Sequence, residues 1–304
     1  MLAVAGVGYA ALAASTSRSQ LARAILWGES DVGDHARFPA RPIEGRIASV
    51  DDPITRYVPE LAGRDPLFKR ITLRHLLTMT SGLRYEETGG PWGDDTATYY
   101  APDLRKLALK ETEIVEAPGR RFHYNNYNPL LVGLGLERAV GMPVAAYLQQ
   151  KLWRPLGMEA DGSWSLDSRA SGFEKMESGL NGRAVDFAKL GLLYARGGAW
   201  HGRQLVPRGW VQDPTVVPTG DGPAPAPGYG LFWWVQSDRS PPAFFARGRY
   251  GQHIYVVPED DLVLVRFGTD TGYRHWPQLL SDLAGRLSLP RQGEGRWNGS
   301  PRRG

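Results

Sequence analysis

The residues best suited to chemistry lie in one stretch, Arg121 to Leu134, written RFHYNNYNPLLVGL. Tyr124 offers a phenol that can exchange a proton, and Asn126 offers an amide that can donate and accept hydrogen bonds. Both precede leucines at helical spacing, and asparagine before such a run is typical of a helix N-cap. We therefore expect both side chains to project from a helix entrance into a neighbouring cleft. The alternative is a capped helix with a half-buried tyrosine and no chemistry.

Other residue types that carry catalysis or bind metals are placed less favourably. Ser81 follows the helical pattern of Ile71 to Met79 and precedes a glycine, so we interpret it as part of a helix stop. His75 lies among leucines, which is typical of a core histidine, and His123 would point away from Tyr124 in an extended segment. No group of His, Asp and Glu has ligand spacing, so the sequence predicts neither a metal nor a cofactor.

Composition limits the class of protein. A chain of 304 residues with 42% hydrophobic residues can bury a full core as one large domain or two small ones. It contains no cysteine, which excludes disulfides, thiolate metal sites and cysteine nucleophiles. The formal net charge is only +4 and no basic run stands out, so nucleic acid is not expected as a partner. The sequence does not indicate an oligomeric state.

The two ends, residues 1–43 and 288–304, are expected to lie outside the main domain. Leu2 to Ala14 is apolar and resembles the end of a signal peptide, although it is too short to span a bilayer and lacks a preceding basic region. We interpret it as a remnant of an export or anchor segment, which predicts an exported or periplasmic protein, or one anchored in a membrane. A plain frayed helix would instead predict a cytoplasmic protein. Ala24 to Gly45 is rich in Gly and Pro and predicts an extended strap, and the polar tail predicts disorder.

Between these ends, residues 44–287 divide into two halves of different character. Helical patterns dominate from about 51 to 198, whereas aromatic and β-branched runs dominate from about 228 to 287. A helix from His275 to Leu287 is expected to cover one face of the resulting antiparallel sheet. The strands of that sheet are expected over Tyr229 to Gln236, His253 to Val257, and Leu262 to Phe267.

Six segments follow one another along the chain; they are ASVDDPITRYVPEL, ITLRHLLTMTSGL, FHYNNYNPLLVGLGLERAVG, LWRPLGM, DFAKLGLLYARGG and GQHIYVVPEDDLVLVRFG. In this order they resemble the serine β-lactamase, penicillin-binding protein and esterase superfamily. The likeness runs from about Glu44 to Leu287 and is greatest to the class C β-lactamase-like branch that includes 6-aminohexanoate-dimer hydrolase relatives. The resemblance implies an α+β, β-lactamase/transpeptidase-like fold and a serine hydrolase that acts on amides, esters or β-lactams through an acyl-enzyme.

The resemblance also implies roles for two motifs. The second motif of the class C-like branch is Tyr-x-Asn, which Tyr124-Asn125-Asn126 matches. It implies that Tyr124 is the general acid/base and that Asn126 orients a lysine or the substrate. The third motif, Lys-Thr-Gly or His-Thr-Gly, would fall at Ala246-Arg247-Gly248, so its first-position cation is missing. Arg247 could partly replace that cation.

The resemblance implies further site residues on the strand that carries the third motif. The resemblance implies that the backbone N–H of Arg249 is one donor of an oxyanion hole, with Gly251 close behind it. Weaker candidates for the substrate cleft are Arg247, Gln252 and Trp92, the last in a glycine-rich loop. A tryptophan that pins such a loop to the core is equally common. The expected ligand is a small-molecule amide, an ester or a peptidoglycan-like compound.

The first motif of the family, Ser-x-x-Lys, is absent. None of the lysines has a serine three residues before it; they are Lys69, Lys106, Lys110, Lys151, Lys175 and Lys189. The family places this motif on a buried helix shortly before the DDPI turn, where this chain has the proline-rich ARFPARP. We hypothesise that the first sheet strands and the nucleophile helix were lost near Ile43 to Gly45. The alternative is divergence in place.

This loss has expected consequences for stability and function. The apolar faces of the ITLRHLL and YNNYNPLLVGL helices would lack their partner, which predicts an under-packed or aggregation-prone product. The predicted function is that of a β-lactamase-related serine hydrolase that is inactive or severely impaired, because no nucleophile is found. The alternatives are a non-catalytic ligand-binding module that keeps the cleft, and a non-functional remnant.

Overall fold

A computed structural model describes residues 2–4, 47, 49–87, 90–212, 228–238, 240–270, 272–273 and 275–288. The predicted strap over Ala24 to Gly45 and the predicted tail beyond residue 288 lie outside the described residues. The helical elements are η1 (Ile54–Arg56), α2 (Glu60–Arg64), η2 (Pro66–Arg70), α3 (Leu73–Leu77), η3 (Gly90–Trp92), α4 (Asp94–Tyr100), α5 (Leu104–Lys110), α6 (Tyr127–Val140), α7 (Val144–Leu148), η4 (Gln149–Trp153), α8 (Ala184–Ala195), α9 (Arg208–Gln212), η6 (Arg249–Gly251), η7 (Pro258–Asp260) and α10 (Trp276–Leu287).

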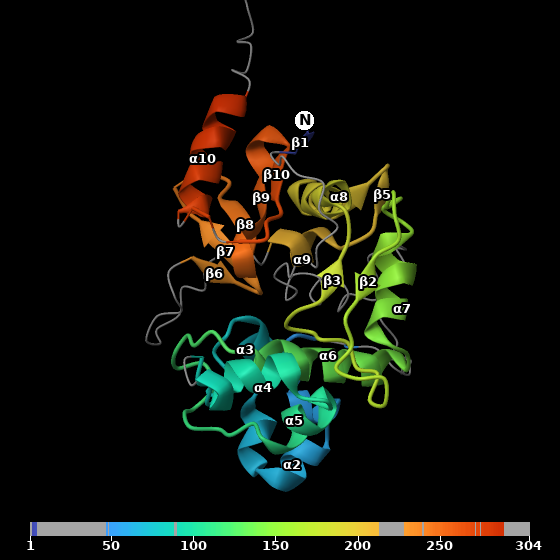
Figure 1. The fold of residues 1–304 in the computed structure, drawn as a ribbon, viewed down its shortest axis with the longest axis vertical. Coiled ribbons are helices and arrows are strands. Elements are labelled where there is room, and N and C mark those ends of the chain that lie inside the picture. The colour runs from blue at the N-terminus through green and yellow to red at the C-terminus, as the bar shows by residue number, and fades with distance from the viewer. Residues whose placement is uncertain are drawn as a thin grey trace, which may run out of the picture.

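The sheet half is a six-stranded sheet in the order β1-β10-β9-β8-β7-β6. Its strands are β1 (Leu2–Val4), β6 (Tyr229–Gly230), β7 (Trp233–Gln236), β8 (Ala243–Gly248), β9 (Gln252–Val257) and β10 (Leu262–Arg266). Helix α8 packs on one face and α10 on the other, as Figure 1 shows. Every residue of β9 is buried because both faces of the sheet are covered. Two short hairpins, β2 (Ser163–Trp164) with β3 (Leu180–Asn181) and β4 (Ala199–Trp200) with β5 (Arg203–Gln204), complete the described strands.

Two details of the sheet differ from the sequence-based expectation. Leu2–Val4, predicted to belong to an export or anchor remnant, forms an edge strand parallel to β10. The predicted single strand over Tyr229 to Gln236 is two antiparallel strands, β6 and β7, joined at Leu231 and Phe232. Phe232 has a φ of 65°, and its N–H donates to the Leu77 carbonyl at 2.8 Å. A tertiary hydrogen bond therefore holds a turn that lacks the usual turn residues.

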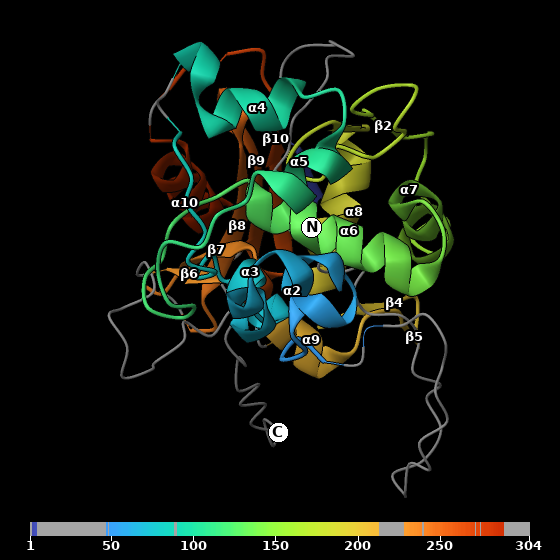
Figure 2. The ribbon, with the colours of Figure 1, turned by 90° about the horizontal axis from the view of Figure 1, so that it is seen from below.

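The helical half is built around α6, as seen from below in Figure 2, where α3 and α5 pack beside it. The sequence predicted that α3 and α6 would expose apolar faces in the absence of a nucleophile helix. This prediction was wrong for the described residues: Leu73, Leu76 and Leu77 are fully buried, and so is the apolar surface of α6. Two glycines of α6, Gly133 and Gly135, allow Met176 and Ile54 to approach closely, so neighbouring segments fill the space around this helix.

No single described helix is long and apolar enough to cross a membrane; α6 and the α7–η4 segment pass that test only as a pair, which is bent by 72°.

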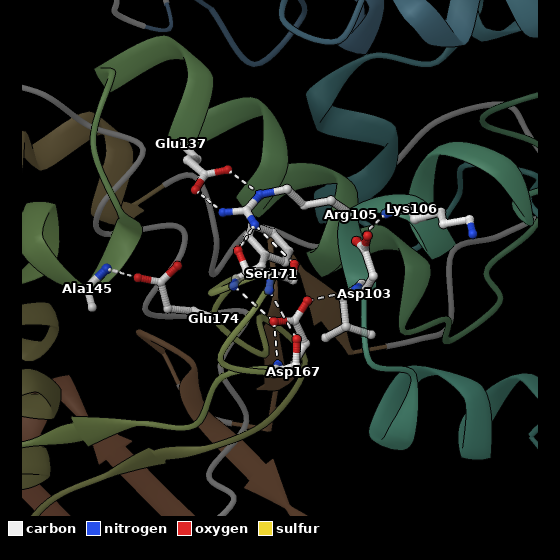
Figure 3. A network of polar contacts seen from close by, with 11 residues as sticks. Asp103, Arg105, Lys106, Glu137, Ala145, Asp167, Ser171 and Glu174 are labelled. Carbon is white, nitrogen blue, oxygen red and sulfur yellow. Dashed lines mark hydrogen bonds and ion pairs between the residues drawn. The ribbon is translucent and has the colours of Figure 1, made fainter.

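A polar network joins three parts of the helical half (Figure 3). Arg105 of α5 pairs with Glu137 of α6, and its Nη1 donates to the Ser171 carbonyl at 2.6 Å. Its guanidinium also lies 4.6 Å from the centre of the Phe173 ring. Asp167 accepts from the backbone N–H of Leu104 at 2.9 Å, which ties the same loop to the start of α5. Arg105 is thus the link between α5, α6 and the loop before β3.

Replacement of Arg105 by Met is expected to lower the free energy of unfolding by about 2 kcal/mol, because Glu137 would keep a charge with only 18% side-chain exposure and no partner cation. The matched control is Arg84→Met, which removes an ion pair to Glu113 whose side chains are 55% and 61% exposed. That change should cost less than about 1 kcal/mol. Urea unfolding followed by circular dichroism measures both; equal costs would contradict a special role for Arg105.

Candidate ligand-binding site

A cavity of about 620 Å³ lies between the two halves of the fold. The helical half contributes Tyr124 and Asn126 to its wall, and the end of β8 and η6 contribute the backbone from Arg247 to Gly251. The start of α10 closes one side with Trp276. Six of the residues singled out in the sequence therefore share one cavity; they are Tyr124, Asn126, Arg247, Gly248, Arg249 and Gly251.

Tyr124 forms part of an aromatic wall. Its ring lies nearly parallel to that of Trp234, with centroids 6.2 Å apart and an interplanar angle of 14°. Tyr229 meets Tyr124 edge to face at 6.3 Å and Trp234 at 4.8 Å. Trp234 is half-buried and is also a lining residue of a second, shallower cavity of about 420 Å³ that continues past Arg247. Flat aromatic faces of this kind suit a planar or apolar part of a ligand.

Asn126 is held by a polar cluster. Its Nδ2 donates to the Tyr85 hydroxyl at 2.7 Å and to Asp95 Oδ1 at 3.2 Å, and Tyr85 also donates to that oxygen at 3.1 Å. Burial raises the pKa of Tyr85 far above its ordinary value, so this phenol stays protonated. The helix cap expected from Asn126 comes instead from Asn125, whose Oδ1 accepts from the N–H of Tyr127 at 2.8 Å. The amide of Asn126 is thus fixed at the cavity wall by α4 and the segment before it.

Arg266 of β10 fixes the turn after β8. Its Nη1 donates to the carbonyls of Tyr250 at 3.0 Å and Gly251 at 2.6 Å, and its guanidinium lies 3.9 Å from the centre of the Trp276 ring. Gly251 has a φ of 73°, and a Cβ there would come within 2.6 Å of Arg266 Nη1. Only glycine leaves room for this guanidinium. Arg266 therefore fixes the two residues that follow Arg249, whose N–H is the predicted oxyanion-hole donor.

Two weaker candidates lie away from the cavity wall. Trp92, on η3, is 95% exposed and is not among the lining residues. Gln252 is 1% exposed, and its side chain pairs with the backbone of Gly268, accepting from the N–H at 3.0 Å and donating to the carbonyl. Gln252 therefore fastens β9 to the segment after β10, and Trp92 neither lines the cavity nor pins its loop to the core.

No serine and no lysine occurs among the described residues that line the cavity. Ser81 is 2% exposed, and its hydroxyl donates to Asn128 Oδ1 at 2.6 Å. His75 is half-buried rather than a core residue, and its Nδ1 accepts from the N–H of Thr72 at 3.1 Å, closing the start of α3. Within the described part of the chain, no group of three His, Asp or Glu could hold a metal ion.

Sequence reasoning missed His253, which lies between two arginines in the sheet. In the strand register it lies opposite Arg247 of β8 on one side and opposite Arg266 of β10 on the other. Its Nδ1 is 3.0 Å from the Gly251 carbonyl, and its Nε2 is buried without a hydrogen-bond partner among the described residues. Burial, with a contribution from both arginines, lowers the pKa of His253 to about 4. Because side chains alternate between the two faces of a strand, the sequence of β9 indicates that His253 lies on the face that α10 covers, beside the cavity.

A comparison with protein-family models identifies the family. The model described as Beta-lactamase matches residues 41–278, which is more than half of the chain. The chain belongs to the β-lactamase family. A 6-aminohexanoate-dimer hydrolase from Paenarthrobacter ureafaciens is 26% identical over 79% of this chain, and esterase EstB from Burkholderia gladioli is 35% identical over 40% of it. The chain spans 65% and 34% of the lengths of these two relatives.

Two solved structures have the same fold. A 6-aminohexanoate-dimer hydrolase-like protein from Bacillus anthracis superposes with a TM-score of 0.72 at 21% identity, covering 90% of this chain and 72% of that one. A penicillin-binding protein from Bacillus halodurans superposes with a TM-score of 0.63 at 18% identity, covering 90% and 85% of the two chains. The predicted α+β, β-lactamase/transpeptidase-like fold class is thus confirmed, and so is the resemblance on which it rested.

Proposed function

We propose that this β-lactamase family protein binds a small amide or ester ligand reversibly in the 620 Å³ cavity and forms no acyl-enzyme with its own residues. The observation that carries the proposal is the composition of the cavity wall. Tyr124, Asn126 and the turn at Arg249 meet there, yet the described lining contains neither serine nor lysine. The Ser-x-x-Lys motif is also missing from the sequence. The cavity therefore keeps groups that recognise a carbonyl compound but not those that attack it.

The chemistry of the wall supports an amide or ester as the ligand. A carbonyl oxygen that reaches the backbone N–H after Gly248 would accept a hydrogen bond from a donor that is already oriented. The rings of Tyr124 and Trp234 lie beside this position and can cover a planar amide or ester group. Two relatives support the same class by their names, a hydrolase of an amide dimer and an esterase. Without an activated serine, such a ligand would be released unchanged.

Incubation with a fluorophosphonate and with a labelled penicillin tests the covalent step. Intact-mass spectrometry is expected to show no adduct, because a labelling reaction requires an activated serine. Covalent labelling that Tyr124→Phe abolishes would overturn the proposal and show an active serine hydrolase. Failure of both labelling and reversible binding would instead support the alternative of a non-functional remnant.

Reversible binding is tested with a matched pair of tryptophan variants. Trp234→Ala removes part of the aromatic wall and should weaken binding of a neutral aryl ester or anilide about tenfold, equivalent to about 1.4 kcal/mol. Trp92→Ala, which removes an equally large ring that is 95% exposed and outside the lining, should leave the affinity unchanged. Isothermal titration calorimetry measures both, after thermal unfolding has shown that both variants fold. Equal affinities of the two variants would exclude this cavity as the binding site.

A further inference from the structure

The face of the sheet that α10 covers is open at one corner. Helix α10 packs over β9 and β10, where its Leu280 and Ala284 are buried against the sheet. Over β7 and β8, beside the first turn of α10, lies instead the second cavity of about 420 Å³. Its lining includes side chains of both strands together with His275 and Gln278. This corner of the sheet therefore offers a hollow next to the cavity that holds Tyr124.

The sheet side of this second cavity is aromatic. Trp234 of β7 and Phe245 of β8 lie opposite each other in the strand register, so both side chains stand on the same face of the sheet. Their ring planes differ by only 13°, their centroids are 6.4 Å apart, and both residues are half-buried. Two neighbouring rings in nearly parallel planes give a continuous apolar surface, against which another flat ring can pack.

Arg247 supplies a positive charge beside these rings. It lies two residues after Phe245 on β8, so its side chain leaves the strand on the same face. It is exposed, and it makes no ion pair within 4 Å with another described residue. Of the described residues that line the second cavity, it is the only one of the types Lys, Arg, Asp and Glu. The cavity therefore attracts an anion.

Gln236, another lining residue, ties β7 to α10 beside the cavity. Its Oε1 accepts from the Tyr255 hydroxyl at 2.9 Å, and its Nε2 donates to Ser281 Oγ of α10 at 3.3 Å. The same Nε2 donates to Asp238 Oδ2 at 3.0 Å, and Asp238 is not among the lining residues. Hydrogen bonds therefore hold together the two elements that bound the cavity, and the amide of Gln236 already has partners at both of its polar atoms.

We propose that the second cavity is a separate binding site for planar aromatic anions, such as aryl carboxylates. The ring of the ligand packs on Trp234 and Phe245, and its carboxylate meets Arg247, since a guanidinium matches a carboxylate with two parallel hydrogen bonds. A volume of about 420 Å³ lies in the range that holds small-molecule ligands. Phe245 lines this cavity and not the first one, so the site can be tested independently of the proposed amide or ester binding.

Three probes of matched size test the two requirements. They are 2-naphthoate, the uncharged 2-naphthamide, and decahydro-2-naphthoate, which keeps the charge but has no aromatic ring. Titration calorimetry at pH 7 is expected to show that 2-naphthoate binds at least about tenfold more tightly than either of the others. Equal binding of the amide would overturn the role of charge, and equal binding of the saturated acid would overturn the role of the rings. Absence of 2-naphthoate binding would overturn the proposal.

Variants locate the bound probe. Phe245→Leu should weaken 2-naphthoate about fivefold or more and leave the affinity for the neutral anilide of the first cavity unchanged. The matched control is Phe267→Leu, which changes a half-buried phenylalanine that lines neither cavity and should alter no affinity. Arg247→Gln should reduce the preference for 2-naphthoate over 2-naphthamide to less than about twofold. That ratio is measured on folded protein, so a general loss of folding does not change it.

Simultaneous binding decides whether the two sites are separate, because Trp234 and Arg247 line both cavities. With the neutral anilide present at saturation, 2-naphthoate is expected to bind with its affinity changed by less than about threefold. Mutual exclusion of the two ligands, or equal effects of Phe245→Leu and Phe267→Leu on 2-naphthoate, would overturn the proposal. If the anilide itself does not bind, the proposed function fails, and the comparison of probes and of the two phenylalanine variants still decides for or against the second site.

Discussion

Replacement of Gly82 by Ala is expected to lower the free energy of unfolding by about 3 kcal/mol or more. Gly82 has a φ of 76°, and a Cβ there would lie 2.1 Å from the carbonyl oxygen of Glu116 and 2.9 Å from its carbon. Both atoms belong to the backbone, so no side chain can rotate away. The Gly82 carbonyl also accepts from the N–H of Val115 at 3.0 Å, which fixes the two segments against each other. Left-handed strain and a backbone collision therefore act together.

Gly141, the glycine directly after α6, provides the control for this prediction. Gly141 ends that helix with a φ of 67°, but a Cβ there would meet nothing within 4 Å. Gly141→Ala therefore introduces only the strain of the left-handed conformation, about 1 to 2 kcal/mol. Urea unfolding of both variants gives the difference. Equal destabilisation would mean that the Gly82 segment moves away from Glu116, so that the steric clash adds nothing to the loss of stability.

The sequence predicted the division of the fold into a helical half and a sheet half because its periodic patterns are strong. The apolar run of β10 and the amphipathic pattern of α8 each specify one element with little ambiguity. The break between β6 and β7 could not be predicted, because the chain there reads as one aromatic strand. Phe232 turns the chain through a hydrogen bond to Leu77, a residue more than a hundred positions earlier. Such a contact leaves no local signal.

The candidate site was predictable only in part, for a similar reason. Tyr124 and Asn126 belong to a motif with fixed spacing, and the turn at Gly248 to Gly251 precedes a recognisable strand, so both were found. Asp95 and Glu177 come from surface segments of ordinary composition, and nothing in their spacing distinguishes them from solvated acids. Their place in the wall of the cavity therefore becomes visible only when the two halves of the fold face each other.

The apolar packing around α6 changes the expected consequence of the missing motif. A helix taken out of a packed core would leave a cavity that costs several kcal/mol. Here the faces of α3 and α6 are covered, with Met176 against Gly133 and Ile54 against Gly135. Close packing at these glycines does not depend on a nucleophile helix. Absence of the Ser-x-x-Lys motif therefore bears on chemistry more directly than on the integrity of this part of the core.

Acidification from pH 6.5 to pH 4 is expected to remove about 3 kcal/mol of stability through His253 alone. In the folded protein, burial and the flanking Arg247 and Arg266 lower the pKa of this histidine from its ordinary value of 6.5 to about 4. Between these two pH values the unfolded chain binds a proton that the folded chain does not. Stability therefore falls as the pH falls through this window, and the contribution levels off about one pH unit below the folded pKa, where both states are protonated.

The contribution of His253 can be isolated by difference, because many carboxyl groups also titrate under acid. His253→Phe places an apolar ring beside Phe245, whose centre lies 6.4 Å from that of the histidine, and removes the titratable group. The free energy of unfolding of wild type minus that of this variant should fall by about 3 kcal/mol between pH 6.5 and pH 4. The same measurement on His201→Asn, which replaces an exposed histidine, is the control for the loss of a histidine. A difference that stays constant with pH would mean that His253 is protonated equally in the folded and unfolded chains, and that Arg247 and Arg266 do not hold it neutral.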